Sequence, residues 1–199
     1  MGNIMIRKPA LALVVICFTG FHSAALAHVG DHSQMSFAEG LVHPFTGLDH
    51  VLAMIAVGLW ASQLGRPALW LLPVIFPLVM AIGAAFGMSG RELPALEIGV
   101  AGSVLVLGAV IAFALRPSLT LSAALVTFFA LLHGYSHGVE LPADVSGLTF
   151  GAGFIAATLV LHAVGIALGL LANRAPARYL ARSAGAVIAI VGLLLLVTV

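Results

Sequence analysis

Apolar residues along this chain fall into long runs that are separated by short polar breaks. A helix needs roughly 20 apolar residues to cross the hydrocarbon core of a membrane. Glycine, proline and charged residues make up the breaks, for example Gly65-Arg66-Pro67. The pattern predicts an all-α fold, a polytopic membrane helical bundle with six transmembrane helices. The six runs cover residues 39–62, 68–88, 93–115, 119–139, 147–172 and 179–198.

The N-terminus has the pattern of a secretory signal peptide. Two basic residues precede a short apolar stretch, and a motif of the type A-x-A ends at Ala27. We expect residues 1–27 to be a cleavable signal peptide and residues 28–199 to form a single six-helix transmembrane domain. The alternative is an uncleaved first helix. Cys17, the only cysteine, would leave with the signal, so the mature chain would offer no thiolate ligand.

Composition narrows the class of protein further. Of 199 residues, 62% are hydrophobic and only 8% are charged, and the mean hydropathy is +1.19, which excludes an ordinary soluble domain. The formal net charge is +1 and no cluster of Lys and Arg occurs. Because nucleic-acid binding depends on such clusters, nucleic acid is excluded as a partner, whereas the lipid bilayer is expected as one.

Charge in the breaks predicts an orientation. After signal cleavage the mature N-terminus is periplasmic, so the first, third and fifth connections face the cytoplasm. These connections carry arginines, and the outer ones carry mainly acids, in agreement with the positive-inside rule. We therefore expect a multi-pass protein of the bacterial inner membrane. The inner residues are Arg66, Arg116, Arg174 and Arg178, and the outer ones are Arg91, Glu92, Glu140 and Asp144.

Ionisable side chains recur at two places within the apolar runs. The motif "HPFTGLDH" covers residues 43–50 and the motif "HGYSHGVE" covers residues 133–140. In the predicted topology both motifs lie at the periplasmic end of their helices. Because ionised groups in a membrane are costly, such residues indicate a functional site. The candidate site residues are His43, Asp49, His50, His133, His137 and Glu140.

Helical spacing supports a shared site. His133, His137 and Glu140 follow one another at i, i+4 and i+7, and therefore share one helix face. His43 and His50 are seven residues apart, nearly two turns, and share a face if the helix is regular. Pro44 is the position at which a break is expected.

Imidazole and carboxylate together suit Ni²⁺, Co²⁺ or Zn²⁺. The acids would offset the charge of the cation or orient the imidazoles. Glu97 is a further candidate at the same depth, and His162 lies deeper, either as a relay or as a packing residue. His28 and His32 belong either to an external capture site or to a tail, and Met54 is a core residue rather than a thioether ligand. The additional metal candidates are therefore His28, His32, Glu97 and His162.

The two motifs resemble those of the HupE/UreJ family, nickel permease-like accessory proteins of hydrogenase and urease systems. The resemblance covers nearly the whole chain. It implies a non-enzymatic transporter with no permanently bound cofactor, which moves Ni²⁺, and in some members Co²⁺, inward. It also implies that the six motif residues are required and that the chain is linked indirectly to nickel-enzyme maturation. No nucleotide-binding motif occurs, so transport would be passive or ion-coupled. Five residues separate His43 from Asp49, unlike the H-x4-D-H pattern of the larger nickel/cobalt transporters.

Other classes stay open. A metal-dependent intramembrane hydrolase would use the same ligands to activate water, although no H-E-x-x-H motif occurs. A sensor or metal-delivery subunit would bind metal without transport. Ser89 lies in a G-x-S-G pattern typical of rhomboid proteases, but residues 179–199 lack the histidine partner. Bis-histidine haem ligation fits poorly beside the acids.

Overall fold

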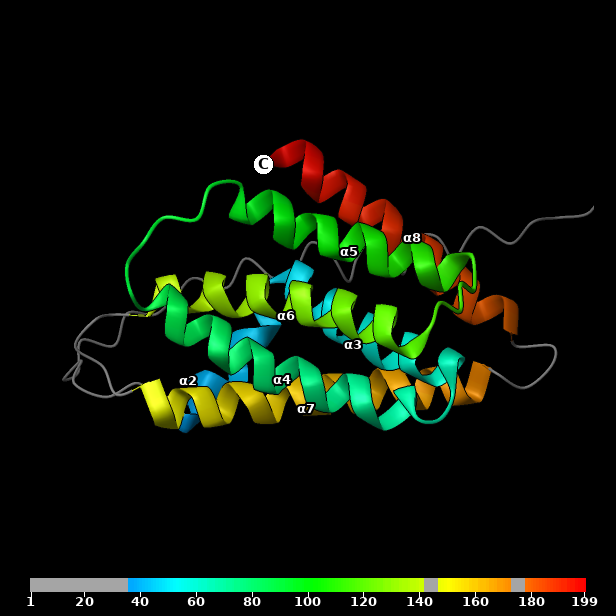
Figure 1. Cartoon of the computed structure of the whole chain (residues 1–199), viewed down its shortest axis with the longest axis horizontal. Helices are drawn as coiled ribbons and strands as arrows, with labels where there is room; N and C mark the ends of the chain where they lie inside the picture. Colours follow the sequence, from blue (N-terminus) through cyan, green and yellow to red (C-terminus); the bar gives the residue numbers. More distant parts are fainter. Residues whose placement is uncertain (1–35, 142–146, 173–177) are drawn as a thin grey trace, which may run out of the picture. The chain divides into compact units, whose positions relative to one another are not determined.

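The computed structural model describes residues 36–141, 147–172 and 178–199 (Figure 1). Every regular element in these ranges is a helix, which confirms the all-α prediction. The predicted signal peptide, His28 and His32 lie outside the described residues. The elements are α2 (Phe37–Val42), η1 (His43–Phe45), α3 (Leu48–Leu64), α4 (Ala68–Gly87), α5 (Leu96–Ala112), α6 (Leu119–Glu140), α7 (Gly147–Ala172) and α8 (Arg178–Thr198).

The run predicted at residues 39–62 is not one straight helix. The segment Phe37–Phe45 meets α3 at an angle of 85°. Pro44 stands in the first turn of the 3₁₀ segment η1, and Gly47 has an extended backbone before α3 begins. Proline cannot donate the backbone hydrogen bond of a continuing helix, so α2 ends before Pro44 in the 3₁₀ turn η1, and the break itself follows between Phe45 and Leu48. The regular helix that would put His43 and His50 on one face is therefore absent.

Within the described residues, the helix lengths give four or five candidate spans rather than six. Four of the described helices are long and apolar enough to cross a membrane, and the bent pair Phe37–Phe45 and Leu48–Leu64 adds a fifth. Helix α5 has 17 residues, which corresponds to about 26 Å of helix against a hydrocarbon core of about 30 Å. It begins only after Pro94, and Ala95 before it is in the left-handed region with φ 59°. The protein is a membrane protein, and the count of six spans stays a prediction.

Glycines allow three pairs of the described helices to pack with their backbones close together. In the pair α4 and α6, a Cβ added at Gly134 or Gly138 would clash with the backbone carbonyl of Met80 or Ala84. The same relation holds between α3 and α7 and between α5 and α8, which lie side by side in Figure 1. Small residues allow membrane helices to approach this closely and to pack by van der Waals contact. The glycines concerned include Gly58, Gly83, Gly87, Gly108, Gly165, Gly169, Gly185 and Gly192.

Candidate metal centre

Three side chains meet at the end of α6 that lies beside the bend. Nε2 of His43 lies 3.2 Å from Nδ1 of His137 and 3.2 Å from Oε2 of Glu140, and the last two atoms are 3.2 Å apart. The break before α3 turns His43 toward the last turn of α6, from which the other two residues project. One nitrogen or oxygen from each therefore forms a nearly equilateral triangle.

This triangle has the dimensions of a metal-binding face. First-row divalent ions lie about 2.0–2.2 Å from nitrogen and oxygen ligands. Two such ligands are therefore about 3.0 Å apart in an octahedral site and about 3.4 Å apart in a tetrahedral site. The observed separations of 3.2 Å lie between these values. The spacing of the three ligand atoms is therefore the spacing that a bound divalent cation requires.

A second layer of imidazoles lies directly behind this triangle. Nε2 of His137 is 2.8 Å from Nδ1 of His50, which is 3.2 Å from Nδ1 of His133. His50 and His133 are only 2% and 1% exposed. Nε2 of His50 is buried without a hydrogen-bond partner. His137 thus contacts both layers. A cation could therefore move from one layer to the other by exchanging one coordinating nitrogen at a time.

Ser103 on α5 fixes the orientation of His133. Its hydroxyl lies 2.6 Å from the backbone oxygen of Val100 and 2.8 Å from Nε2 of His133. A serine has one hydroxyl hydrogen, which the carbonyl oxygen takes because it can only accept. The hydroxyl oxygen therefore accepts from Nε2–H of His133, and a neutral His133 keeps its lone pair on Nδ1, which faces His50. Ser103 was not among the predicted site residues, because a single serine in an apolar helix carries no signal of its own.

The predicted carboxylates do not all join the cluster. Oδ1 of Asp49 accepts a hydrogen bond of 2.7 Å from the backbone N–H of His50, in the first turn of α3. Asp49 lines a cavity of about 350 Å³ together with the triangle residues and His133, but it is not part of the triangle. Glu97 is exposed in the first turn of α5, and no contact with the histidines is recorded among the described residues. Its role as a ligand stays a prediction.

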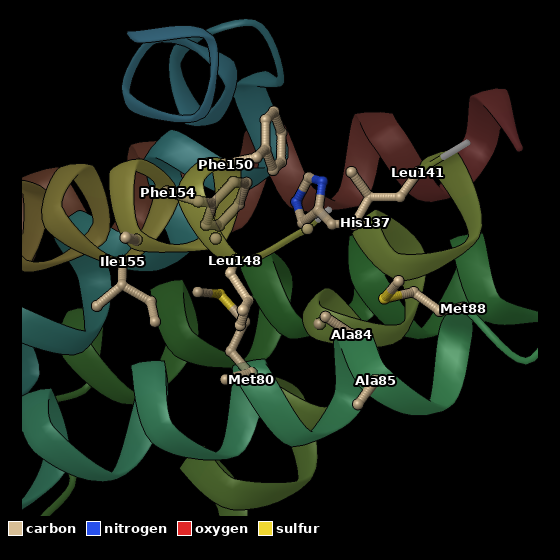
Figure 2. A pocket seen from close by; sticks show the side chains of 15 residues that line it. Met80, Ala84, Ala85, Met88, His137, Leu141, Leu148, Phe150, Phe154 and Ile155 are labelled. Carbon is tan, nitrogen blue, oxygen red and sulfur yellow. The ribbon is translucent and has the colours of Figure 1, made fainter. Parts of the chain in front are cut away.

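Phenylalanines of α7 form the apolar wall of the cluster. The ring of Phe154 lies 4.6 Å from that of His137 and 4.9 Å from that of His50, and Phe150 lies 5.3 Å from His43. Beyond them an apolar cavity of about 430 Å³ opens between α4, α6 and α7, with His137 on its wall (Figure 2). Apolar walls exclude water and so strengthen electrostatic contacts inside the site. Sequence analysis did not single out these phenylalanines.

The remaining candidates lie deeper. His162 is 1% exposed in α7, and its ring centroid lies 5.4 Å from that of Phe76. Phe76 also contacts His133, at 5.9 Å. Met54 is fully buried in the apolar core, as expected of a packing residue.

Comparison with known proteins shows which family the chain belongs to. The profile of the family described as HupE / UreJ protein matches residues 16–195. The chain is also 45% identical over 175 residues to Protein HupE of Rhizobium leguminosarum bv. viciae, covering 88% of this chain and 91% of the relative. The chain belongs to the HupE/UreJ family. No solved structure matches it.

In this HupE/UreJ chain the two motifs meet in space although about 90 residues separate them. The first motif supplies His43, Asp49 and His50, and the second supplies His133, His137 and Glu140. Five of these six side chains are joined by contacts of 2.8–3.2 Å. The structure therefore brings together two regions that the sequence linked only through helix direction.

Proposed function

We propose that this HupE/UreJ protein carries Ni²⁺ or Co²⁺ from the periplasm to the cytoplasm through a site between its first and fourth transmembrane helices. The observation that carries the proposal is the triangle of His43, His137 and Glu140, whose ligand atoms are 3.2 Å apart. Membership of the family supports it. The ion is cargo, so no permanently bound cofactor is required.

The ligand types favour this class of cation. Two imidazoles and one carboxylate suit Ni²⁺, Co²⁺ and Zn²⁺, and the single cysteine lies in the proposed signal peptide. Glu140 supplies one negative charge against the two positive charges of the ion. Its side chain is 54% exposed, so it faces the side from which a hydrated ion arrives. The triangle would thus capture the ion before it loses most of its water.

Movement from the triangle would proceed through His137. This side chain offers Nδ1 to the triangle and Nε2 to His50, and the buried pair of His50 and His133 follows. Successive exchange of one ligand at a time avoids a fully dehydrated and unligated ion in low dielectric, which would be very costly. The transfer would be passive or ion-coupled.

The proposed topology has six spans after a cleaved signal peptide, in the inner membrane and with a periplasmic mature N-terminus. Helix α3 runs from the metal centre toward Arg66, and Arg116 lies in the connection between α5 and α6. The metal centre and these arginines are therefore at opposite ends of α3 and α6. The positive-inside rule then places the centre toward the periplasm. The nickel delivered would serve nickel-enzyme maturation.

Uptake of radiolabelled Ni²⁺ into proteoliposomes tests the proposal, with Co²⁺ and Zn²⁺ as competitors. We compare the wild-type protein with Glu140→Gln and with Glu92→Gln, a matched change at an exposed carboxylate outside the cluster. We expect Glu140→Gln to reduce Ni²⁺ uptake and Glu92→Gln to leave it unchanged. Metal binding by wild-type protein without any uptake would contradict transport and favour a sensor or delivery subunit.

The apolar cavity beside His137 favours one other function, a metal-dependent intramembrane hydrolase. Its lining from α4, α6 and α7 would fit an acyl chain or an apolar peptide (Figure 2). A cation on the triangle would then activate water next to that substrate. Hydrolysis of a lipid or amide that a chelator abolishes would support this function, and its absence in protein that transports Ni²⁺ would exclude it.

A further inference from the structure

A second group of buried polar atoms lies below the metal centre, on α7. His162 and Thr158 are one helical turn apart and so share a face. They are 1% and 0% exposed, and neither the ring nitrogens of His162 nor the hydroxyl of Thr158 have a hydrogen-bond partner. Buried polar groups without partners cost free energy and are rare in native proteins.

The neighbouring helix α4 offers an unused oxygen at the same place. Pro77 has no N–H, so the carbonyl of Pro73 loses the donor that a regular helix would supply. This carbonyl faces His162, although the geometry falls short of a hydrogen bond to either ring nitrogen. An imidazole and a hydroxyl on one face of α7, and a carbonyl on the neighbouring helix α4, are therefore each left with a lone pair to offer.

The group is close to the metal centre but separate from it. The ring of Phe76 lies between the two, 5.9 Å from the ring of His133 and 5.4 Å from that of His162. Phe154, which contacts the outer histidines, precedes His162 by eight residues, or about 12 Å along α7. Ten residues remain from His162 to the end of α7 at Ala172, about 15 Å toward the other side of the membrane.

We propose that His162, Thr158 and the carbonyl of Pro73 form an inner transfer site for the same divalent cation. The inference rests on the proposed transport function. The site receives the ion from His50 and His133 and passes it toward the cytoplasmic end of the bundle. It explains why the lone pairs of the imidazole, the hydroxyl and the carbonyl are kept without partners, because a transient ion would bind them.

The ligands of the two sites differ in a way that suits this order. The outer triangle includes the carboxylate of Glu140, whereas the inner group contains only neutral ligands. Neutral ligands bind a divalent cation more weakly than a set that includes an anion. Conduction requires a site that binds well enough to be entered and weakly enough to be left. The inner site therefore releases what the outer site captures.

Two substitutions of His162 test whether this residue is a metal ligand or only a packing residue. His162→Phe keeps a ring of similar size, and His162→Gln keeps a donor for the carbonyl of Pro73. Both remove the imidazole lone pair. We measure Ni²⁺ uptake into proteoliposomes and, on the same purified proteins, Ni²⁺ binding to the outer cluster by calorimetry. Thr158→Val is compared with Ser122→Ala, a buried hydroxyl on α6 that donates to the backbone of Ser118.

We expect both His162 variants to bind Ni²⁺ as the wild type does but to take it up at least about 10-fold more slowly, as for other lost metal contacts. Thr158→Val should slow uptake and Ser122→Ala should not. Wild-type uptake in either His162 variant would overturn the inner site and leave the transport function intact. Loss of outer binding in both variants would also overturn it, because His162 would then be structural. Wild-type protein without uptake would instead refute the transport function itself.

Discussion

The triangle and the second layer of the metal centre both contain imidazoles, but in opposite surroundings. The side chains of His43 and His137 are 32% and 16% exposed and share the carboxylate of Glu140. His50 and His133 are almost fully buried, and their partners are other imidazoles and a serine. Under the proposed function, the difference corresponds to a division of labour, in which charge and water access serve capture and neutral buried ligands serve transfer.

Removal of His137 should have the largest effect, because this residue belongs to both layers. We expect His137→Ala to reduce Ni²⁺ uptake by more than about 100-fold, since even outer-shell contacts to metal ligands are worth 10- to 100-fold. Proteoliposome uptake measures the effect, with circular dichroism as the check on folding. Folded His137→Ala protein with a normal uptake rate would contradict movement of the ion through His137.

Loss of the carboxylate should weaken capture more than transfer. We expect Glu140→Gln to raise the Ni²⁺ concentration for half-maximal uptake by about 10- to 100-fold, with a smaller change in the maximal rate. Uptake measured over a range of Ni²⁺ concentrations separates the two parameters, with Glu92→Gln as the control. A fall in the maximal rate alone would place Glu140 in the transfer step and contradict the division.

Ser103 provides a test of the second layer, His50 and His133, alone. Ser103→Ala removes the acceptor that holds the Nε2–H of His133, so the ring can turn its lone pair away from His50. We expect a reduction of the maximal uptake rate of about 10-fold, with Ni²⁺ binding to the outer triangle preserved. Ser122→Ala, which removes a buried hydroxyl elsewhere, is the matched control. Equal effects of the two substitutions would exclude a specific role for Ser103.

Met54 should show the smallest effect. It is fully buried one turn after His50 and packs in the apolar core. We expect Met54→Leu, which conserves volume, to change the free energy of unfolding by less than about 1.5 kcal/mol and to leave uptake within about twofold of wild type. Thermal unfolding and uptake assays measure both quantities. A large loss of uptake with normal stability would make the thioether a ligand after all.

The sequence carried much of the site because its ligands are chemically conspicuous. Histidine and glutamate stand out in apolar helices, and helix direction alone placed residues 43–50 beside residues 133–140. Ser103, Phe150 and Phe154 could not be found in this way. Serine and phenylalanine are common in membrane helices, and their role here depends on which helices become neighbours.

The helices themselves show a similar limit. Long apolar runs predicted where α4, α6, α7 and α8 lie, because length and hydropathy decide such segments. The angle of 85° before α3 and the late start of α5 depend on local backbone geometry at Pro44, Gly47 and Ala95. Pro44 signalled a break, but neither its angle nor its consequence for His43 could be derived from residue types.

The glycine contacts divide the ligands between separate mechanical units. Helices α3 and α7 are locked together through Gly58 and Gly165, and α4 and α6 through Gly83 and Gly134. Backbones in such contact cannot slide past each other without steric overlap. The first motif and His162 belong to one unit, and the second motif and Pro73 belong to the other. Under the proposed function, a cation bound by both motifs would join these two rigid units, and its departure would allow them to separate.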